Sequence, residues 1–202
     1  MATALSCVDS NSHRFSSVTG PAIRKLSLSE FRNYKRLKLE LSREPIVLTG
    51  ENGAGKTNLI EAVSFLAPGR GIRKARLSEI DMVLEKNQEQ VSGVIERGLA
   101  SWAVSVDLES KNDRLVIGTG RDEKAAVVGS DKRIVRINGH QVKSHSILSN
   151  YLSISWLTPQ MDRLFLDGPS QRRRFLDRLV FAFDPKHSSR VNSYTHALRE
   201  RN

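Results

Sequence analysis

The sequence predicts an α/β protein built around a phosphate-binding loop, and three observations support this fold class. Residues 50–57 read G-E-N-G-A-G-K-T, between an apolar run that suits a strand and an amphipathic run that suits a helix. Short runs with alternating apolar and polar residues recur along the middle of the chain. Residues 169–201 instead show helical periodicity with many arginines. We therefore expect a nucleotide-binding core beside a mainly antiparallel sheet, followed by helices.

The first ordered element is expected near Ala22, after a Ser-rich leader over residues 1–21 that we predict to be disordered. Alternation predicts strands over residues 23–28 and 35–41, and the β-branched run at 46–49 predicts a third strand. A helix follows the phosphate-binding loop, because Leu59, Ala62, Val63 and Leu66 share one face.

The loop comprises Gly50, Glu51, Asn52, Gly53, Ala54, Gly55, Lys56 and Thr57. Its three glycines allow backbone dihedrals that other residues avoid, so successive N–H groups can converge on one anion. The following helix adds unpaired N–H groups and the positive end of its dipole. The Lys56 amine suits the β- and γ-phosphates, and the Thr57 hydroxyl suits Mg²⁺. These residues predict an ATP–Mg²⁺ site.

The middle of the chain reads as loop and strands. Residues 67–76 form a loop of glycine, proline and basic residues. Strands are predicted over 91–96, 102–108, 115–119 and 133–137, and Asn138-Gly139 predicts a hairpin that returns through 140–143. A short helix at 144–151 and a buried strand at 154–157 follow, with Trp102 and Trp156 expected in the core.

The C-terminal part is predicted to be helical. Residues 162–166 have helical character, Pro169 opens a helix through residue 183, and a last helix covers about 186–201. We divide the chain into the leader, a lobe over residues 22–158 that holds the loop and the sheet, and a helical region over 159–202 that begins an arm.

The charge favours polyanionic partners. The formal net charge is +10 over 202 residues, which suits nucleic acid first and an acidic membrane surface second, although a basic soluble enzyme has the same composition. Cys7 is the single cysteine, so the sequence provides no disulfide framework and favours a reducing compartment. No apolar run approaches the length of a membrane span.

Basic clusters are the candidate DNA contacts. Arg70, Arg73 and Lys74 follow the first helix and could bind phosphates through charge and bidentate hydrogen bonds, or form a solvated loop. The Arg172–Arg174 run could follow a DNA backbone, but a solvated helix face with local pairing to Asp177 is the commoner arrangement.

Several strings together resemble the RecF family of bacterial DNA replication and repair proteins, which are ABC-class ATPases. F-R-N-Y at 31–34, the phosphate-binding loop, P-G-R-G-I-R, L-T-P-Q at 157–160 and G-P-S-Q-R-R-R-F-L-D at 168–177 occur in the family's order. The last string is the most specific, and the similarity extends from about Ile23 to Asn202.

This resemblance implies an ABC-type ATPase head with a mixed sheet and an antiparallel β subdomain. It also implies binding of single- and double-stranded DNA, ATP-dependent homodimerisation, work with other recombination mediator proteins, and a cytoplasmic role in replication, recombinational repair and the SOS response. Arg32 and Asn33 match the family's first loop beside the nucleotide. Gln160 falls near the glutamine that senses Mg²⁺ in ABC proteins.

The chain departs from the family's pattern in its length. The family's Walker B acids and signature motif follow the arm, and this sequence contains neither. We therefore expect the N-terminal part of a RecF-type protein, which does not hydrolyse ATP by itself although the full-length family has weak ATPase activity. Two alternatives are an inert fragment that binds nucleotide or DNA weakly, and a small-molecule kinase with a phosphate-binding loop.

Overall fold

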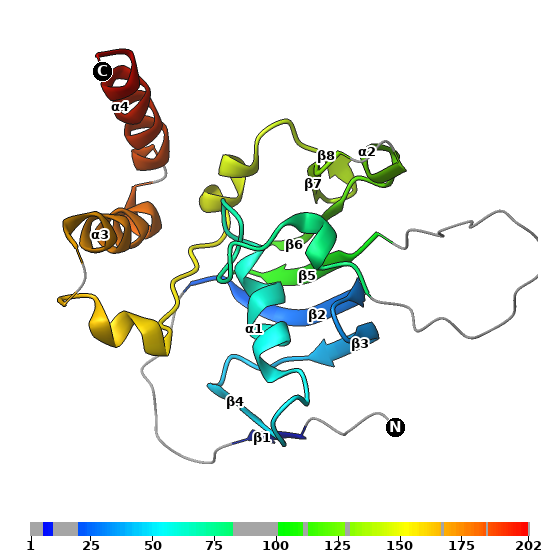
Figure 1. The fold of residues 1–202 in the computed structure, drawn as a ribbon. Coiled ribbons are helices and arrows are strands. Elements are labelled where there is room, and N and C mark those ends of the chain that lie inside the picture. The colour runs from blue at the N-terminus through cyan, green and yellow to red at the C-terminus, as the bar shows by residue number, and fades with distance from the viewer. Residues whose placement is uncertain are drawn as a thin grey trace, which may run out of the picture.

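A computed structural model shows the fold, and it describes residues 6–9, 20–82, 101–110, 113–127, 130–166, 168–184 and 186–201. Its main element is a six-stranded sheet in the order β3-β2-β5-β6-β7-β8, with α1 lying across one face (Figure 1). The strands of this sheet are β2 (Ala22–Phe31), β3 (Tyr34–Glu40), β5 (Ala103–Glu109), β6 (Arg114–Arg121), β7 (Arg133–Ile137) and β8 (His140–Gln141). The strand predicted at 91–96 lies outside the described residues.

Every strand pair in this sheet is antiparallel, so the mixed sheet predicted from the resemblance is wrong for the described residues. Parallel pairing requires a crossover that returns the chain to a neighbouring strand. Within the described residues, helix α1 (Lys56–Ser64) is followed up to residue 82 by turns, the 3₁₀ helix η1 (Leu77–Glu79) and a single antiparallel bridge from Asp81 to Phe31, so no parallel strand follows it there. The hairpin at Asn138-Gly139 is confirmed, with φ of 49° and 83° at these two residues.

The strand before the phosphate-binding loop pairs outside the six-stranded sheet. Strand β4 (Ile46–Thr49) forms a two-stranded antiparallel ladder with β1 (Ser6–Asp9). The prediction of a disordered leader over residues 1–21 is therefore wrong at Ser6–Asp9. The Ser-rich composition hid a four-residue run, S-C-V-D, whose backbone supplies hydrogen-bonding groups to the edge of β4.

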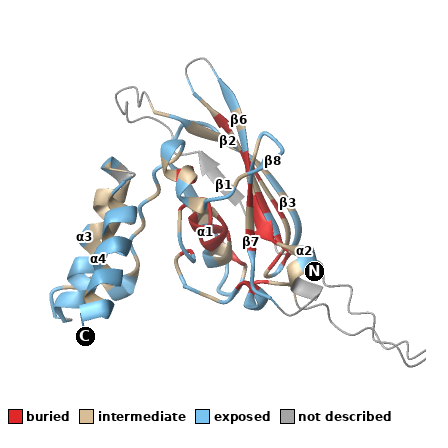
Figure 2. Ribbon diagram, turned by 90° about the horizontal axis from the view of Figure 1, so that it is seen from above, coloured by how far each residue is buried: buried red, intermediate tan, exposed pale blue. Residues whose placement is uncertain are grey.

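The core lies between α1 and the sheet, where the buried residues gather (Figure 2). Phe31, Phe65 and Trp102 form its aromatic centre, with ring centroids 5.0–6.1 Å apart. The Trp102 indole donates to the carbonyl of Leu77 at 3.0 Å, so its polar atom is satisfied. The predicted core position of Trp102 is confirmed. Gly120 makes this packing possible, because a Cβ there would lie 2.6 Å from the Trp102 carbonyl oxygen.

The chain from residue 144 onward is partly different from the prediction. The helix predicted at 144–151 is the 3₁₀ helix η2 (His145–Asn150). The helical character predicted at 162–166 is displaced, because the 3₁₀ helix η3 covers Pro159–Arg163 and residues 164–166 form turns. A further short helix, α2 (Glu123–Val127), was not predicted. The buried strand predicted at 154–157 is wrong: this segment pairs with no described strand, and Leu157 is 80% exposed. Trp156 is half-buried and stacks against Arg178.

Two helices end the chain, α3 (Pro169–Phe183) and α4 (His187–Arg201), and they pack against each other (Figure 1). Asp177 pairs with His187 across them at 2.9 Å, in place of the local arginine partners considered from the sequence. Arg173 lies over the Tyr194 ring, 4.7 Å from its centroid. Among the described helices, none has both the length and the apolar character needed to cross a membrane.

Candidate nucleotide-binding site

The phosphate-binding loop joins the end of β4 to the start of α1. Gly50, Gly53 and Gly55 all have positive φ, at 147°, 87° and 100°. Positive φ is strained for residues that carry a Cβ, which explains why each of these three positions is a glycine. Ala54 N donates to the Glu51 carbonyl at 3.2 Å, which closes a tight turn before the helix. The prediction that residues 50–57 form a strand–loop–helix junction is confirmed.

Several amide groups of this loop are available to an anion. The N–H groups of Gly53, Gly55, Lys56 and Thr57 donate no hydrogen bond to any other group of the described residues. The first intrahelical bond is that of Leu59 N to the Gly55 carbonyl at 3.0 Å. Because a helix leaves its first amides unpaired and carries positive charge at this end, these groups suit phosphate oxygens.

Lys56 and Thr57 begin α1. The Lys56 amine donates to the carbonyls of Gly50 at 2.6 Å and Glu51 at 2.8 Å, so it closes over the loop's own backbone. A phosphate bound by the loop would replace these two carbonyls as the acceptor of the amine. Thr57 is exposed at the second position of the helix. Its hydroxyl is thus accessible to a hydrated Mg²⁺ ion, which keeps several waters and takes few protein ligands.

The turn between β2 and β3 packs against this loop. A Cβ on Gly55 would lie 2.6 Å from the Tyr34 hydroxyl and 2.7 Å from Asn33 Nδ2, so side chains from this turn reach the start of α1. Asn58 Nδ2 also donates to Asn33 Oδ1 at 2.9 Å. The Tyr34 hydroxyl is buried and has no hydrogen-bond partner among the described residues, and burial raises the pKa of this phenol. Asn33 therefore lies beside the phosphate-binding loop, as the resemblance implied.

A buried carboxylate organises the arginines beside the loop. Glu61 is fully buried on α1 and accepts from Arg32 Nη2 at 2.8 Å, Arg32 Nε at 3.1 Å and Arg73 Nη1 at 3.0 Å. Arg73 Nη1 also donates to Asn58 Oδ1 at 2.9 Å. Sequence reasoning missed Glu61. The available signal was an acidic residue on a core-facing helix, followed by an arginine-rich loop that could neutralise it.

The far end of α1 is closed by Arg133 from β7. Its guanidinium donates to the carbonyls of Phe65 and Ala67, and to that of Gly69 at 2.8 Å. The Nε group donates to the Thr119 hydroxyl at 2.7 Å. Burial lowers the pKa of Arg133 to about 10. A cation here binds the carbonyls of the C-cap residue Phe65 and of the turn that follows, and it complements the dipole of α1 at the end remote from the loop.

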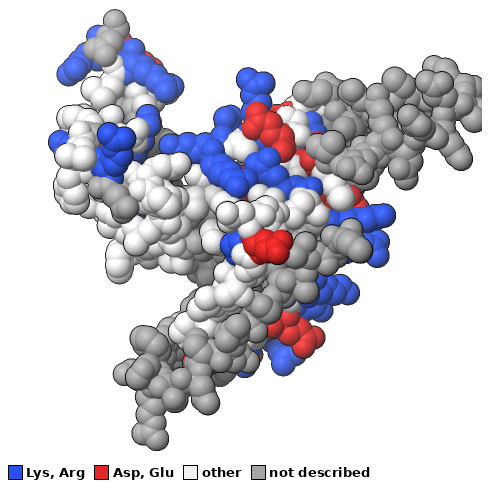
Figure 3. Space-filling model, turned by 60° about the horizontal axis from the view of Figure 1, so that its bottom comes forward, with Lys and Arg blue, Asp and Glu red and all other residues white. Residues whose placement is uncertain are grey.

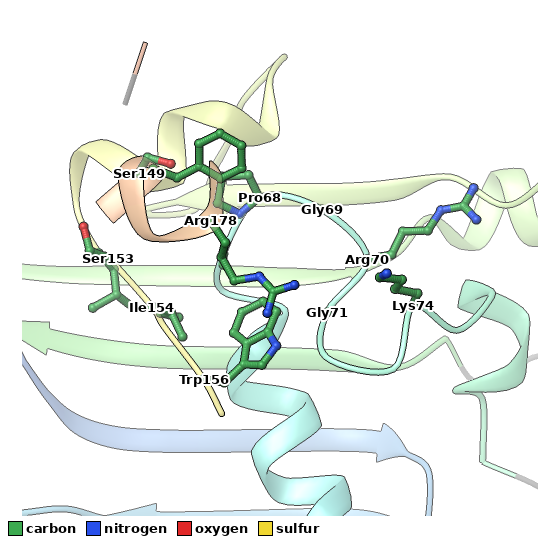
Figure 4. Close-up of a pocket in the computed structure, with 13 residues that line it drawn as sticks. Pro68, Gly69, Arg70, Gly71, Lys74, Ser149, Ser153, Ile154, Trp156 and Arg178 are labelled. Atoms are coloured by element: carbon green, nitrogen blue, oxygen red, sulfur yellow. The ribbon is translucent and has the colours of Figure 1, made fainter. Parts of the chain in front are cut away.

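The remaining predicted site residues divide between two places. Arg73 points to Glu61 and Asn58 beside the phosphate-binding loop. Arg70 and Lys74 line a cavity together with Trp156 and Arg178, shown in Figure 4. Gln160 lies on η3 in the wall of an adjoining cavity to which residues 50–57 contribute nothing. The DNA contacts of Arg70, Arg73 and Lys74 and the Mg²⁺ contact of Gln160 stay predictions.

The local chemistry fits a nucleoside triphosphate. One short stretch brings together the helix N-terminus, the Lys56 amine and four amides that have no acceptor in the described part of the chain. Glu61, which would repel phosphate if exposed, is buried and neutralised by two arginines. Such a loop, when it holds a triphosphate, provides charge stabilisation through fixed donors.

Comparisons with known proteins agree with this fold. Residues 22–160 match the model of the RecF/RecN/SMC N terminal domain. The chain is 43% identical over 180 residues to the DNA replication and repair protein RecF of Rhizobium rhizogenes, and 44% identical over 181 residues to that of Agrobacterium fabrum. These alignments cover 89% and 90% of the chain, and 44% of each relative.

Solved structures show the same fold. The chain superposes on the recombination mediator protein RecF-ATPrS of the RecFOR pathway with a TM-score of 0.69 at 22% identity, covering 90% of this chain and 44% of that one. The corresponding RecF-ATP structure gives a TM-score of 0.65 at 23% identity, with coverage of 90% and 45%. The chain spans less than half the length of the relatives it matches. It is a RecF homologue and belongs to the RecF/RecN/SMC N-terminal domain family.

Proposed function

We propose that this chain carries the nucleotide-binding part of a RecF-type DNA replication and repair protein, and that it binds ATP with Mg²⁺. The observation that supports this proposal is the loop itself: four amides without acceptors among the described residues, three glycines at positive φ and the amine of Lys56 at the start of α1. In this role Lys56 transfers its hydrogen bonds from the Gly50 and Glu51 carbonyls to phosphate oxygens, and Thr57 binds the metal.

The same proposal includes DNA as the second ligand, single- or double-stranded, with an affinity that ATP changes. The net charge of +10 supports a polyanionic partner. Lys and Arg side chains gather along the middle of the face in Figure 3, between the C-terminal helices and the rest of the molecule. ATP-dependent homodimerisation, recombination mediator proteins as partners, a cytoplasmic location and a role in the SOS response belong to the same proposal.

We propose that this chain binds ATP without hydrolysing it by itself. Transfer of the γ-phosphoryl group needs a positioned water and charge stabilisation on more than one side. The described residues place a carboxylate beside the loop in Glu61, but it is fully buried and engaged by Arg32 and Arg73, so it is not free to orient a water. We therefore propose a nucleotide-binding element whose effect is on DNA affinity and self-association.

The test is equilibrium binding of a fluorescent ATP analogue with Mg²⁺ to the wild-type chain and to Lys56→Ala. Lys38→Ala is the matched control, since Lys38 is an exposed lysine of β3. Loss of one charge-assisted hydrogen bond should weaken binding by about ten- to hundredfold in Lys56→Ala. Lys38→Ala should bind as the wild type does. Equal affinity of all three proteins, or no binding by the folded wild type, would contradict the proposal.

DNA binding by the same proteins tests whether bound ATP changes the affinity for DNA. Labelled single- and double-stranded oligonucleotides are titrated with and without ATP–Mg²⁺, and self-association is followed by light scattering. ATP should change the DNA affinity of the wild type and of Lys38→Ala, but not that of Lys56→Ala. A DNA affinity that ATP leaves unchanged in the wild type would refute the coupling while leaving nucleotide binding intact.

A further inference from the structure

A cavity of about 170 Å³ lies between the loop after α1 and helix α3. Its walls come from residues 67–74, residues 149–156, and Arg178 and Phe181 of α3. Figure 4 shows the Arg178 side chain reaching down from α3 to lie over Trp156, while Arg70 and Lys74 come from the glycine-rich loop at the other side. The cavity thus joins two parts of the sequence that are about a hundred residues apart.

Arg178 brings an unpaired hydrogen-bond donor to this cavity. Its Nη1 atom is buried and makes no hydrogen bond with the described part of the chain, although a guanidinium carries five donors. The face of the guanidinium is held 4.6 Å from the centroid of the Trp156 ring, a cation–π contact that fixes its orientation. Burial lowers the pKa of Arg178 from its ordinary value. Arg178 as a whole is half-buried, but a fixed guanidinium with one buried and unpaired donor favours an anion beside it.

The surroundings of Arg178 are cationic. Arg70 and Lys74 also line the cavity, and its described lining residues include no aspartate or glutamate. An adjoining cavity shares Lys74, Trp156 and Arg178 and adds Arg174, and its described lining residues likewise include no carboxylate. Glu61, the buried acid of the neighbouring helix, is already engaged by Arg32 and Arg73. The described residues therefore bring several positive charges to this place without a matching negative one.

We propose that this cavity binds one phosphate group of a nucleic acid strand, with Arg178 as the bidentate donor and Lys74 as the second cation. The ligand class follows from charge and geometry. A planar guanidinium matches two phosphate oxygens, and Lys74 lies in the wall of the same cavity. The inference rests on the proposed function in taking DNA as the polyanion.

The experiment measures binding of labelled single- and double-stranded oligonucleotides to wild type, Arg178→Gln and Arg163→Gln over a series of salt concentrations. Arg163 is the matched control, because it is an exposed arginine on η3 that lines neither cavity. Arg178→Gln should weaken binding about tenfold at low salt, and its slope of log affinity against log salt should fall by about 0.7 to 0.9, the value for one phosphate contact. Arg163→Gln should keep the wild-type slope.

Tryptophan emission gives an independent measurement in the same proteins. The chain has two tryptophans, of which Trp102 is fully buried and Trp156 contacts Arg178. Oligonucleotide should change the emission of the wild type, and the change should be absent in Trp156→Phe, which retains Trp102. Circular dichroism melts verify that each variant is folded, and Arg178→Lys, which keeps the charge without the planar fork, should recover part of the affinity.

Each other outcome overturns the inference in a different way. If Arg178→Gln binds DNA as Arg163→Gln does, the phosphate contact is elsewhere and the proposed DNA-binding function stands. If the folded wild type binds no oligonucleotide at 50 mM salt, both proposals fail. If ATP alone changes the Trp156 emission in Lys56→Ala, the cavity takes a free nucleotide. If an acidic peptide of equal charge competes as well as DNA, the cavity takes a protein partner.

Discussion

Replacing Glu61 by glutamine should destabilise the protein strongly, because this side chain neutralises two arginines inside the structure. The Glu61 carboxylate is 1% exposed, while the Arg32 and Arg73 side chains are 20% and 42% exposed. Glutamine has nearly the same shape but offers one acceptor oxygen in place of two. Whichever way its amide is turned, an NH₂ group then faces the N–H donors of at least one arginine.

The magnitude follows from the partners left behind. Breaking a buried ion pair by removing one charge costs about 3–5 kcal/mol, since the other charge stays buried without compensation. Arg73 can turn to solvent and Arg32 is partly exposed, which reduces the cost here to about 2–3 kcal/mol. With a urea slope of about 1–3 kcal/mol per molar, the unfolding midpoint should fall by roughly 1–3 M.

The assay is equilibrium unfolding in urea followed by circular dichroism, with wild type, Glu61→Gln and Glu79→Gln side by side. Glu79 is exposed and its carboxylate accepts from Arg76 N at 3.1 Å, so Glu79→Gln should cost less than about 1 kcal/mol. The reasoning is refuted if Glu61→Gln loses no more stability than Glu79→Gln. A double-mutant cycle between Glu61→Gln and Arg32→Gln should show a coupling of about 1 kcal/mol or more.

Two further predictions concern the loop and the pH dependence. Gly55→Ala should cost about 1–3 kcal/mol and abolish ATP binding, because φ is 100° and a Cβ would lie 2.6 Å from the Tyr34 hydroxyl. A Cβ on Gly53 meets nothing within 4 Å, so Gly53→Ala should have a smaller effect in both urea unfolding and nucleotide titration. Equal effects of the two substitutions would contradict this reasoning. Burial and the charge of Arg133 lower the pKa of His145, so the fold disfavours its protonated form. Stability should therefore be higher above the unfolded pKa, near 6.5, and fall as the pH drops from there to the folded pKa. The excess stability of wild type over His145→Gln in urea should shrink from pH 8 to pH 5, and a constant difference would refute the assignment.

Local patterns in the sequence predicted the elements whose partners are close along the chain. The alternation in residues 115–119 and 133–137 and the Asn138-Gly139 pair give strands and a hairpin without knowledge of the rest of the fold. The glycine spacing of residues 50–57 likewise predicted a loop that needs positive φ at three positions. These features depend on backbone sterics, which a short segment already contains.

Features that depend on distant partners could not be predicted. Glu61 and Arg32 are 29 positions apart, and only their meeting makes a carboxylate tolerable in the core. The apolar run around Trp156 suited a buried strand, but no described strand pairs with it, and Trp156 packs instead on Arg178 of α3. Whether an apolar segment becomes a strand is decided by a neighbour that supplies hydrogen bonds, and the segment itself does not encode that neighbour.

The separation of β4 from the large sheet has a consequence for how the molecule responds to nucleotide. Among the described strands β4 is bonded to β1, so four residue pairs hold the segment that leads into the phosphate-binding loop. Strand β5, by contrast, is bonded on both edges. Amide protons of β4 should therefore exchange with deuterated solvent well before those of β5, at a smaller opening free energy. If nucleotide slows amide exchange at Val47 and Leu48, this change would indicate that the loop has closed on a ligand.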